Sequence, residues 1–172
     1  MRLVLCGVQS PINIGMILRS AEIYRVAVLI HDAYGVFSDK GKVRTISDFG
    51  CGALQRHPPS IVKTLSVSDL RGRLVRSDTV AGAQSHLAFE WQAGDSLLIG
   101  NEYDGVPQDL AAASHASVTI PMPPGHFPKP ESFDPIDSER AARIARQGMP
   151  SLNTAVAASA MISAAYARGL LG

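Results

Sequence analysis

Residues 2–32, RLVLCGVQSPINIGMILRSAEIYRVAVLIHD, decide the fold class of this chain. The apolar run at 2–8 predicts a short buried strand, and the run at 26–32 predicts a second one. Between them, Ser10 and Pro11 are typical of a helix start, in which serine caps the helix and proline takes its first position. Apolar residues spaced three and four apart then give this helix one buried stripe. A strand, a helix and a strand in this order predict a βαβ unit with a parallel strand pair.

The alternation of strands and helices continues along the chain. We expect further strands at 78–84, 96–100 and 116–122, helices at 69–75, 106–114 and 151–169, and mixed, partly helical structure over 37–54. Such alternation indicates an α/β protein, in which a mostly parallel sheet is flanked by helices on both faces.

Composition narrows the class of protein. The 172 residues, 46% of them hydrophobic and 18% charged, predict one globular domain over 1–172. A net charge of +1 means that any basic surface for nucleic acid must be local. Cys6 and Cys51 are too few for a disulfide framework or a zinc cluster, which favours a reducing compartment. Because no signal peptide or membrane-spanning run is evident, we expect a cytoplasmic protein with no membrane partner.

The stretch LLIGNEYDGVP, residues 97–107, places two acids directly after a predicted strand. Glu102 and Asp104 lie between Gly100 and Gly105, which allow tight backbone geometry or close approach of a ligand. Ligands of open α/β sheets bind at the carboxyl ends of the strands. Taken alone, the stretch is compatible with a metal site, an acid/base pair or a polar turn. A metal site would need further ligands at fixed spacing, and none is evident nearby.

Two more motifs carry polar residues at the starts of predicted helices. The first helix brings Asn13, Gly15 and Arg19, and MPSLNTAVAASA brings Ser151 and Asn153, either of which can cap the last helix. Each motif alone fits an ordinary packing or capping role. The first turn lacks G-x-G-x-x-G, which argues against a nucleotide-binding enzyme of Rossmann or flavodoxin type.

Taken together and in this order, the three motifs resemble the SpoU/TrmH branch of the SPOUT RNA methyltransferases. The resemblance extends from Pro11 to about Tyr166. It implies an α/β domain with a C-terminal trefoil knot that binds S-adenosylmethionine and forms a homodimer through the knotted region. It also implies methyl transfer to a ribose 2′-hydroxyl of tRNA or rRNA, with S-adenosylhomocysteine as the other product. No metal is implied, because the methyl donor is already activated.

The resemblance assigns site residues motif by motif. The catalytic positions it implies are Arg19, Asn13, Glu102, Ser151 and Asn153. The cofactor contacts it implies are Val80, Ala81, Gly82, Ile99, Gly100, Asn101, Glu102, Ile120, Met122, Ser151, Leu152 and Asn153. We expect Glu102 to organise the site by hydrogen-bonding Asn13 or the polar groups of the third motif. The motif does not fix Asp104, so the two acids are not expected to act as a pair.

Arg19 has two possible roles. In this family the arginine of the first motif is proposed as the base that deprotonates the 2′-hydroxyl, helped by the RNA phosphate. Arginine stays protonated in almost any protein setting. A guanidinium fork that grips the phosphate beside the target ribose is therefore the physically safer role.

The sequence departs from the family pattern in two places. Many relatives carry an N-terminal RNA-binding domain, whereas the first motif here begins at residue 11, so we expect the same unit and its dimer mate to hold the RNA. Residues 123–148 form an insertion, whose Arg140, Arg143 and Arg146 are expected to contact RNA phosphates. Alternatively, this segment braces the dimer or covers the cofactor. The other functional alternative is an inactive RNA-binding relative, and the intact motif residues argue against it.

Overall fold

The computed structural model describes residues 1–80, 82–123 and 152–169. Its strands are β1 (Arg2–Cys6), β2 (Ala27–His31), β3 (Ser60–Val62), β4 (Leu74–Ser77), β5 (Gln84–Ser85), β6 (Ser96–Gly100) and β7 (Ala116–Thr119). Its α-helices are α1 (Pro11–Ile23), α2 (Lys40–Phe49), α3 (Ala53–Arg56), α4 (Gln108–Ala112) and α6 (Thr154–Ala167). The described residues also contain two short 3-10 helices, η1 (Val36–Ser38) and η2 (Val67–Asp69).

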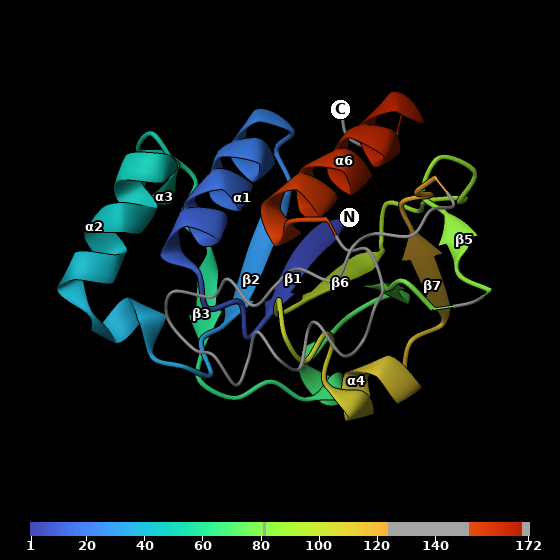
Figure 1. Ribbon diagram of the computed structural model, residues 1–172, viewed down its shortest axis with the longest axis horizontal. Coiled ribbons are helices and arrows are strands. Elements are labelled where there is room, and N and C mark those ends of the chain that lie inside the picture. Colours follow the sequence, from blue (N-terminus) through green and yellow to red (C-terminus); the bar gives the residue numbers. More distant parts are fainter. Residues whose placement is uncertain (81, 124–151, 170–172) are drawn as a thin grey trace.

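The described strands form one seven-stranded sheet in the order β3-β2-β1-β6-β4-β7-β5 (Figure 1). Each neighbouring pair of strands is parallel. The predicted βαβ unit, β1-α1-β2, is confirmed. After β2 and β3 the chain returns to the other side of β1, so the strand order reverses between β1 and β6. Crevices for ligands open at such switch points, outside the carboxyl ends of the strands.

Helices cover both faces of the sheet, as predicted from the alternation of elements. Figure 1 shows α1, α2, α3 and α6 on one face and α4 on the other. Because side chains of a strand alternate between faces, Leu3 and Leu5 of β1 join the core under α1 and α6. Val4 and Cys6 join the smaller core under α4. The apolar runs in the sequence therefore reflect strands that are buried on both faces.

Helix α1 begins and packs as its sequence predicts. The Ser10 hydroxyl oxygen accepts a hydrogen bond from the Asn13 backbone N–H at 3.3 Å, and Pro11 is the first helical residue. Gly15 lies where α1 meets α2. A β-carbon on Gly15 would lie 2.6 Å from the Ile46 carbonyl oxygen, so only glycine permits this approach. The ordinary packing role considered for Gly15 is the one the structure shows.

Helix α6 lies beside α1 and starts at the same edge of the sheet. The hydroxyls of Ser20 and Ser159 are 2.8 Å apart, and the rings of Tyr24 and Tyr166 have centroids 5.3 Å apart. Asn153 caps α6, since its side-chain oxygen accepts from the backbone N–H groups of the first turn. The two helices thus present their N-termini to the carboxyl ends of the strands.

The predictions of a helix over 69–75 and a strand over 78–84 were wrong. The strand of this region is β4, and its residues Leu74 and Val75 are buried on opposite faces of the sheet. The charged residues around this four-residue strand concealed its pattern in the sequence. Only the two-residue β5 falls within or near the expected strand. The short edge strand β3 was also missed, because it offers three residues and no buried stripe.

The predicted trefoil knot and the helical half of the insertion lie outside the described residues, as do Ala81 and Ser151. Among the helices that the structure describes, none is long and apolar enough to cross a membrane.

Candidate functional site

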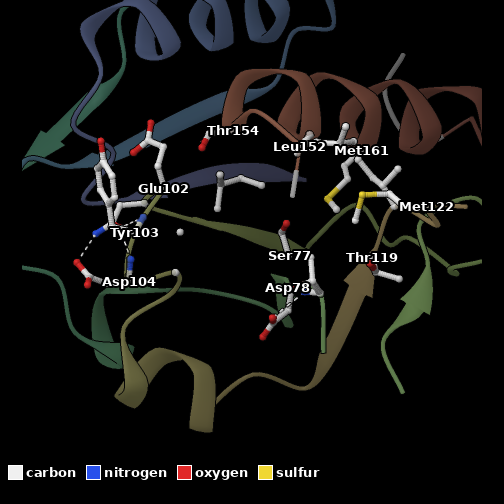
Figure 2. Close-up of a pocket in the computed structure, with 17 residues that line it drawn as sticks. Ser77, Asp78, Glu102, Tyr103, Asp104, Thr119, Met122, Leu152, Thr154 and Met161 are labelled. Carbon is white, nitrogen blue, oxygen red and sulfur yellow. Dashed lines mark hydrogen bonds between the residues drawn. The ribbon is translucent and has the colours of Figure 1, made fainter. Parts of the chain in front are cut away.

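A cavity of about 550 Å³ lies at the carboxyl ends of β4, β6 and β7, beside the start of α6 (Figure 2). This volume falls in the range of small-molecule sites. The cavity is lined by Ser77, Asp78, Thr79, Ile99, Gly100, Asn101, Glu102, Tyr103, Asp104, Gly105, Thr119, Ile120, Met122, Leu152, Thr154, Ala157 and Met161.

The loop after β6 forms one wall of the cavity through a tight hydrogen-bonded turn. Asn101 and Gly105 exchange backbone hydrogen bonds of 3.2 Å, and Gly105 has a positive φ of 71°. The side-chain oxygen of Asn101 accepts from the backbone N–H groups of Tyr103 and Asp104. A β-carbon on Gly100 would overlap the backbone of Gly105, so the turn folds back on a position that must be glycine. Main chain therefore lies directly against the cavity.

Asp104 belongs to this turn. Its carboxylate accepts from the Asn101 side-chain nitrogen at 3.3 Å, whereas Glu102 makes its hydrogen bond elsewhere. The two acids are not hydrogen-bonded to one another, which agrees with the expectation that they do not work as a pair.

A directional chain of hydrogen bonds joins the three sequence motifs. The Asn153 oxygen accepts from the first N–H groups of α6, so its nitrogen must donate, and it does so to the Asn13 side-chain oxygen at 3.1 Å. The Asn13 nitrogen then donates to Glu102 Oε1 at 2.6 Å. The helix terminus thereby fixes the orientation of both amides and holds the carboxylate in place. The contact predicted between Glu102 and Asn13 is present.

The cavity has a polar end and an apolar end. In Figure 2, Glu102, Tyr103 and Asp104 lie on one side, and Met122 and Met161 lie on the other. Thr154 lies above the cavity between these ends, at the first turn of α6. A ligand with both a charged part and an apolar part would fit this arrangement.

Most of the predicted cofactor contacts line the cavity. Those that do are Ile99, Gly100, Asn101, Glu102, Ile120, Met122 and Leu152. Asn153, Val80 and Gly82 do not. Val80 and Gly82 instead line a smaller cavity of about 320 Å³ with Arg76 and His115. The reason is that β4 ends at Ser77, so the residues of this segment that reach the cavity are Ser77, Asp78 and Thr79.

Arg19 lies away from the cavity. It is exposed on α1, on the same face as Ile12, Met16 and Ile23, and no described residue forms a hydrogen bond or ion pair with it. The structure thus brings Asn13, Glu102 and Asn153 together but leaves Arg19 on an outer face. Arg140, Arg143 and Arg146 lie outside the described residues.

Sequence reasoning missed the residues that complete the cavity wall. Ser77 ends a strand that was misplaced, and Asp78 and Thr79 follow it, so no sequence signal located them. Thr154, Ala157 and Met161 carried a signal that was not used, because their spacing places them on one stripe of α6 directly after the capping residue.

The described residues bear on two chemical roles, metal binding and nucleophilic attack by a cysteine. No group of three or more His, Cys, Asp and Glu side chains is placed there to hold a metal ion. Burial raises the pKa of the Cys6 thiol to about 12, so this cysteine is a poor nucleophile at neutral pH.

Comparison with known proteins gives one family and several similar structures. A model of the SpoU rRNA Methylase family matches residues 1–128. The SpoU methyltransferase AviRb from Streptomyces viridochromogenes, solved in complex with the cofactor AdoMet, is 22% identical, with a TM-score of 0.69 over 100% of this chain and 61% of the AviRb chain. The A. aeolicus TrmH/SpoU tRNA modifying enzyme is 16% identical, with a TM-score of 0.69 over 99% of this chain and 77% of that enzyme.

A further structure, described as giving insights into the 2-OH methylation of C/U34 on tRNA, is 21% identical, with a TM-score of 0.67 over 96% of this chain and 93% of that chain. The chain therefore spans 61% of the length of AviRb but most of this shorter protein. The search of curated proteins gives no match. The structural likenesses confirm the predicted fold class.

Proposed function

Because the chain belongs to the SpoU rRNA Methylase family, we propose that it transfers a methyl group from S-adenosylmethionine to a ribose 2′-hydroxyl of tRNA or rRNA. The observation that carries this proposal is the hydrogen-bond chain from the α6 terminus through Asn153 and Asn13 to Glu102, at the polar end of a ligand-sized cavity. This series of hydrogen bonds joins the three motifs that define the resemblance to SpoU and TrmH enzymes.

The cavity suits S-adenosylmethionine in chemistry as well as in size. Gly100 lets the turn at Asn101–Gly105 fold back on the strand end and line the cavity with main chain, and Ile99, Ile120 and Met161 offer apolar contact. Carboxylates at the polar end favour a cationic ligand. When bound, this cofactor supplies a methyl group that its sulfonium has already activated. The relative AviRb was solved with the same cofactor.

The protein's task is then to position the acceptor oxygen and accommodate its proton. Transfer would join the methyl carbon to the ribose oxygen and leave S-adenosylhomocysteine, and the hydroxyl proton would pass to solvent water. Holding the two reacting groups in line supplies much of the acceleration. Glu102, held in place by Asn13, forms a rigid part of the cavity wall for this alignment. Arg19, on the outer face of α1, acts as a fork for an RNA phosphate outside the cavity.

We also propose that the chain is a homodimer, formed through the outer face of α1 and α6. Apolar side chains are exposed on this face, namely Ile12, Met16, Ile23, Val156 and Tyr166. Apolar surface rimmed by polar residues is typical of an interface. Arg19 lies within the same face, so dimer formation would bring it to the boundary between the two copies. Sedimentation of the protein at micromolar concentration tests this, and a monomer would contradict it.

The assignment of the insertion remains a proposal from sequence. Arg140, Arg143 and Arg146 would contact RNA phosphates, and each such contact makes binding more sensitive to salt. The free thiols Cys6 and Cys51 support a reducing compartment, which agrees with a cytoplasmic enzyme that acts on RNA.

Titration of the protein with S-adenosylmethionine in a calorimeter tests the cofactor site. We expect binding by the wild-type chain, and about 5- to 100-fold weaker binding by Gly100→Ala, because the added methyl group displaces the turn that lines the cavity. Gly94→Ala is the matched control, since a β-carbon there has no neighbour within 4 Å. Absence of binding by the wild-type chain would contradict the proposed function. Equal binding by Gly100→Ala would place the cofactor elsewhere.

A further inference from the structure

Tyr34 is an exposed aromatic residue at the same edge of the sheet as the candidate site. Its side chain is 49% exposed, and it follows β2 by a short turn. A β-carbon on Gly7, which follows β1, would lie 3.3 Å from the Tyr34 ring atom Cε2 and 3.9 Å from the side-chain nitrogen of Asn101. Tyr34 and Asn101 therefore flank the same glycine, and Asn101 lines the cavity. The ring thus lies next to the cavity wall that carries Glu102.

The turn that presents Tyr34 is held by a buried carboxylate. Asp32 is only 4% exposed, and its oxygens accept from the backbone N–H groups of Val36 at 2.6 Å and Phe37 at 3.2 Å. Lys63 lies 3.6 Å from the same carboxylate. Gly35 takes the left-handed conformation, with φ 66°, that closes the turn. The backbone that carries the ring is consequently held before any ligand arrives, which lowers the entropic cost of binding at this turn.

The Tyr34 ring makes no aromatic pair with another described residue. Elsewhere in the described chain, Tyr24 pairs with Tyr166 and Phe89 pairs with Trp91. Tyr34 is also absent from both apolar clusters of the core. Its ring therefore offers surface to a ligand without being needed for the packing of the sheet.

We propose that Tyr34 stacks on a nucleobase of the RNA that neighbours the methylated nucleotide. The inference rests on the proposed function, because that function places a target ribose in the adjacent cavity. Proteins read single-stranded RNA mainly through bases that are splayed out and stacked on aromatic side chains. A base next to the target nucleotide would leave the helical stack in the same way when the ribose enters the cavity.

The segment that follows Tyr34 in the chain carries exposed lysines, which are compatible with an RNA ligand. Lys40 and Lys42 are exposed in the first turn of α2, shortly after Tyr34 in the chain. Cationic side chains beside an aromatic platform are the usual composition of a single-stranded RNA surface, in which the cations track the backbone and the ring takes the base. The overall charge of +1 is no obstacle, because such a surface needs only local cations.

Three variants test the stacking role: Tyr34→Ala, Tyr34→Phe and, as a matched control, Phe49→Ala. Phe49 is a similarly exposed aromatic residue, 46% exposed, at the far end of α2. The probes are unfractionated tRNA and rRNA from cells that lack the protein. For each variant, filter binding gives the dissociation constant for RNA, methyl incorporation gives KM and kcat, and calorimetry gives the affinity for S-adenosylmethionine.

We expect Tyr34→Ala to weaken RNA binding and raise KM for RNA by about 5- to 50-fold, with cofactor affinity unchanged. Tyr34→Phe and Phe49→Ala should stay within twofold of wild type. RNA binding by Tyr34→Ala within twofold of wild type would overturn the inference. So would an equal loss in Tyr34→Phe, since the hydroxyl rather than the ring would then be responsible.

The same data separate this inference from the proposed function. If the wild-type chain binds RNA through Tyr34 but methylates neither RNA, the stacking role stands and the proposed reaction fails. If the wild-type chain methylates RNA and Tyr34→Ala binds it equally well, the reaction stands and the stacking role fails.

Discussion

Replacing Arg19 by alanine is expected to lower the rate of RNA methylation by roughly 100- to 1000-fold, with cofactor affinity left within about twofold of wild type. A cationic group that holds the substrate in its reactive position typically contributes this much. Cofactor affinity should not change, because Arg19 is exposed on α1 and does not line the cavity. Arg19→Lys should be nearly as inactive, since an ammonium group lacks the two-pronged geometry of a guanidinium. Methyl incorporation and calorimetry measure the two quantities.

Arg44→Ala is the matched control for Arg19→Ala. Arg44 is an exposed arginine on the neighbouring helix α2, where it forms only a surface ion pair of 3.9 Å with Asp48. Such pairs contribute little, so this variant should methylate RNA at about the wild-type rate. Loss of cofactor binding by Arg19→Ala would contradict the assignment of Arg19 to RNA binding. Full methylation activity of Arg19→Ala would show that Arg19 has no role in the reaction.

Asn13→Asp is expected to destabilise the fold by roughly 2–4 kcal/mol at pH 8. Asn13 is 6% exposed, and its nitrogen donates to Glu102 Oε1 at 2.6 Å. The substitution replaces this donor by a second carboxylate, so two like charges meet with little water between them. Such a pair takes up a proton as the pH falls. The variant should therefore be less destabilised in acid than at pH 8. Urea unfolding at several pH values measures the effect.

The double variant Asn13→Asp with Glu102→Gln isolates the electrostatic cause. An amide at position 102 can donate to the new carboxylate, so the hydrogen bond reforms in the opposite direction. The double variant should therefore be more stable at pH 8 than Asn13→Asp alone, with a coupling free energy of about 1–3 kcal/mol. If the effects of the two substitutions on the free energy of unfolding simply add, the short contact between these side chains does not govern stability.

The fold class could be predicted from the sequence because its strongest signals are local. Ser10, Pro11 and the apolar run before them fix β1 and the start of α1, and the structure agrees. The failures have a common cause. β4 is four residues long and carries Arg76 and Ser77, so it lacks the continuous apolar run of a typical buried strand. Its burial comes from its neighbours β6 and β7, which are distant in sequence.

The candidate site also contains residues that could be predicted from the sequence and residues that could not. Asn13, Glu102 and Asn153 could be predicted to meet because their motifs follow one another in a family order, and the structure shows the hydrogen bonds that link them. Asp78 and Thr79 could not be predicted, because their place in the cavity depends on where β4 ends. The outward position of Arg19 could not be predicted either, since it depends on how α1 packs between α2 and α6.

The most direct test of the proposed reaction compares RNA from cells with and without this protein. Total tRNA and rRNA are mapped for 2′-O-methyl groups by mass spectrometry. We predict that one or a few ribose methyl groups disappear in the deletion strain, return with the wild-type gene, and do not return with Arg19→Ala. An unchanged set of 2′-O-methyl groups, or the loss of a methyl group from a base instead, would contradict the proposed function.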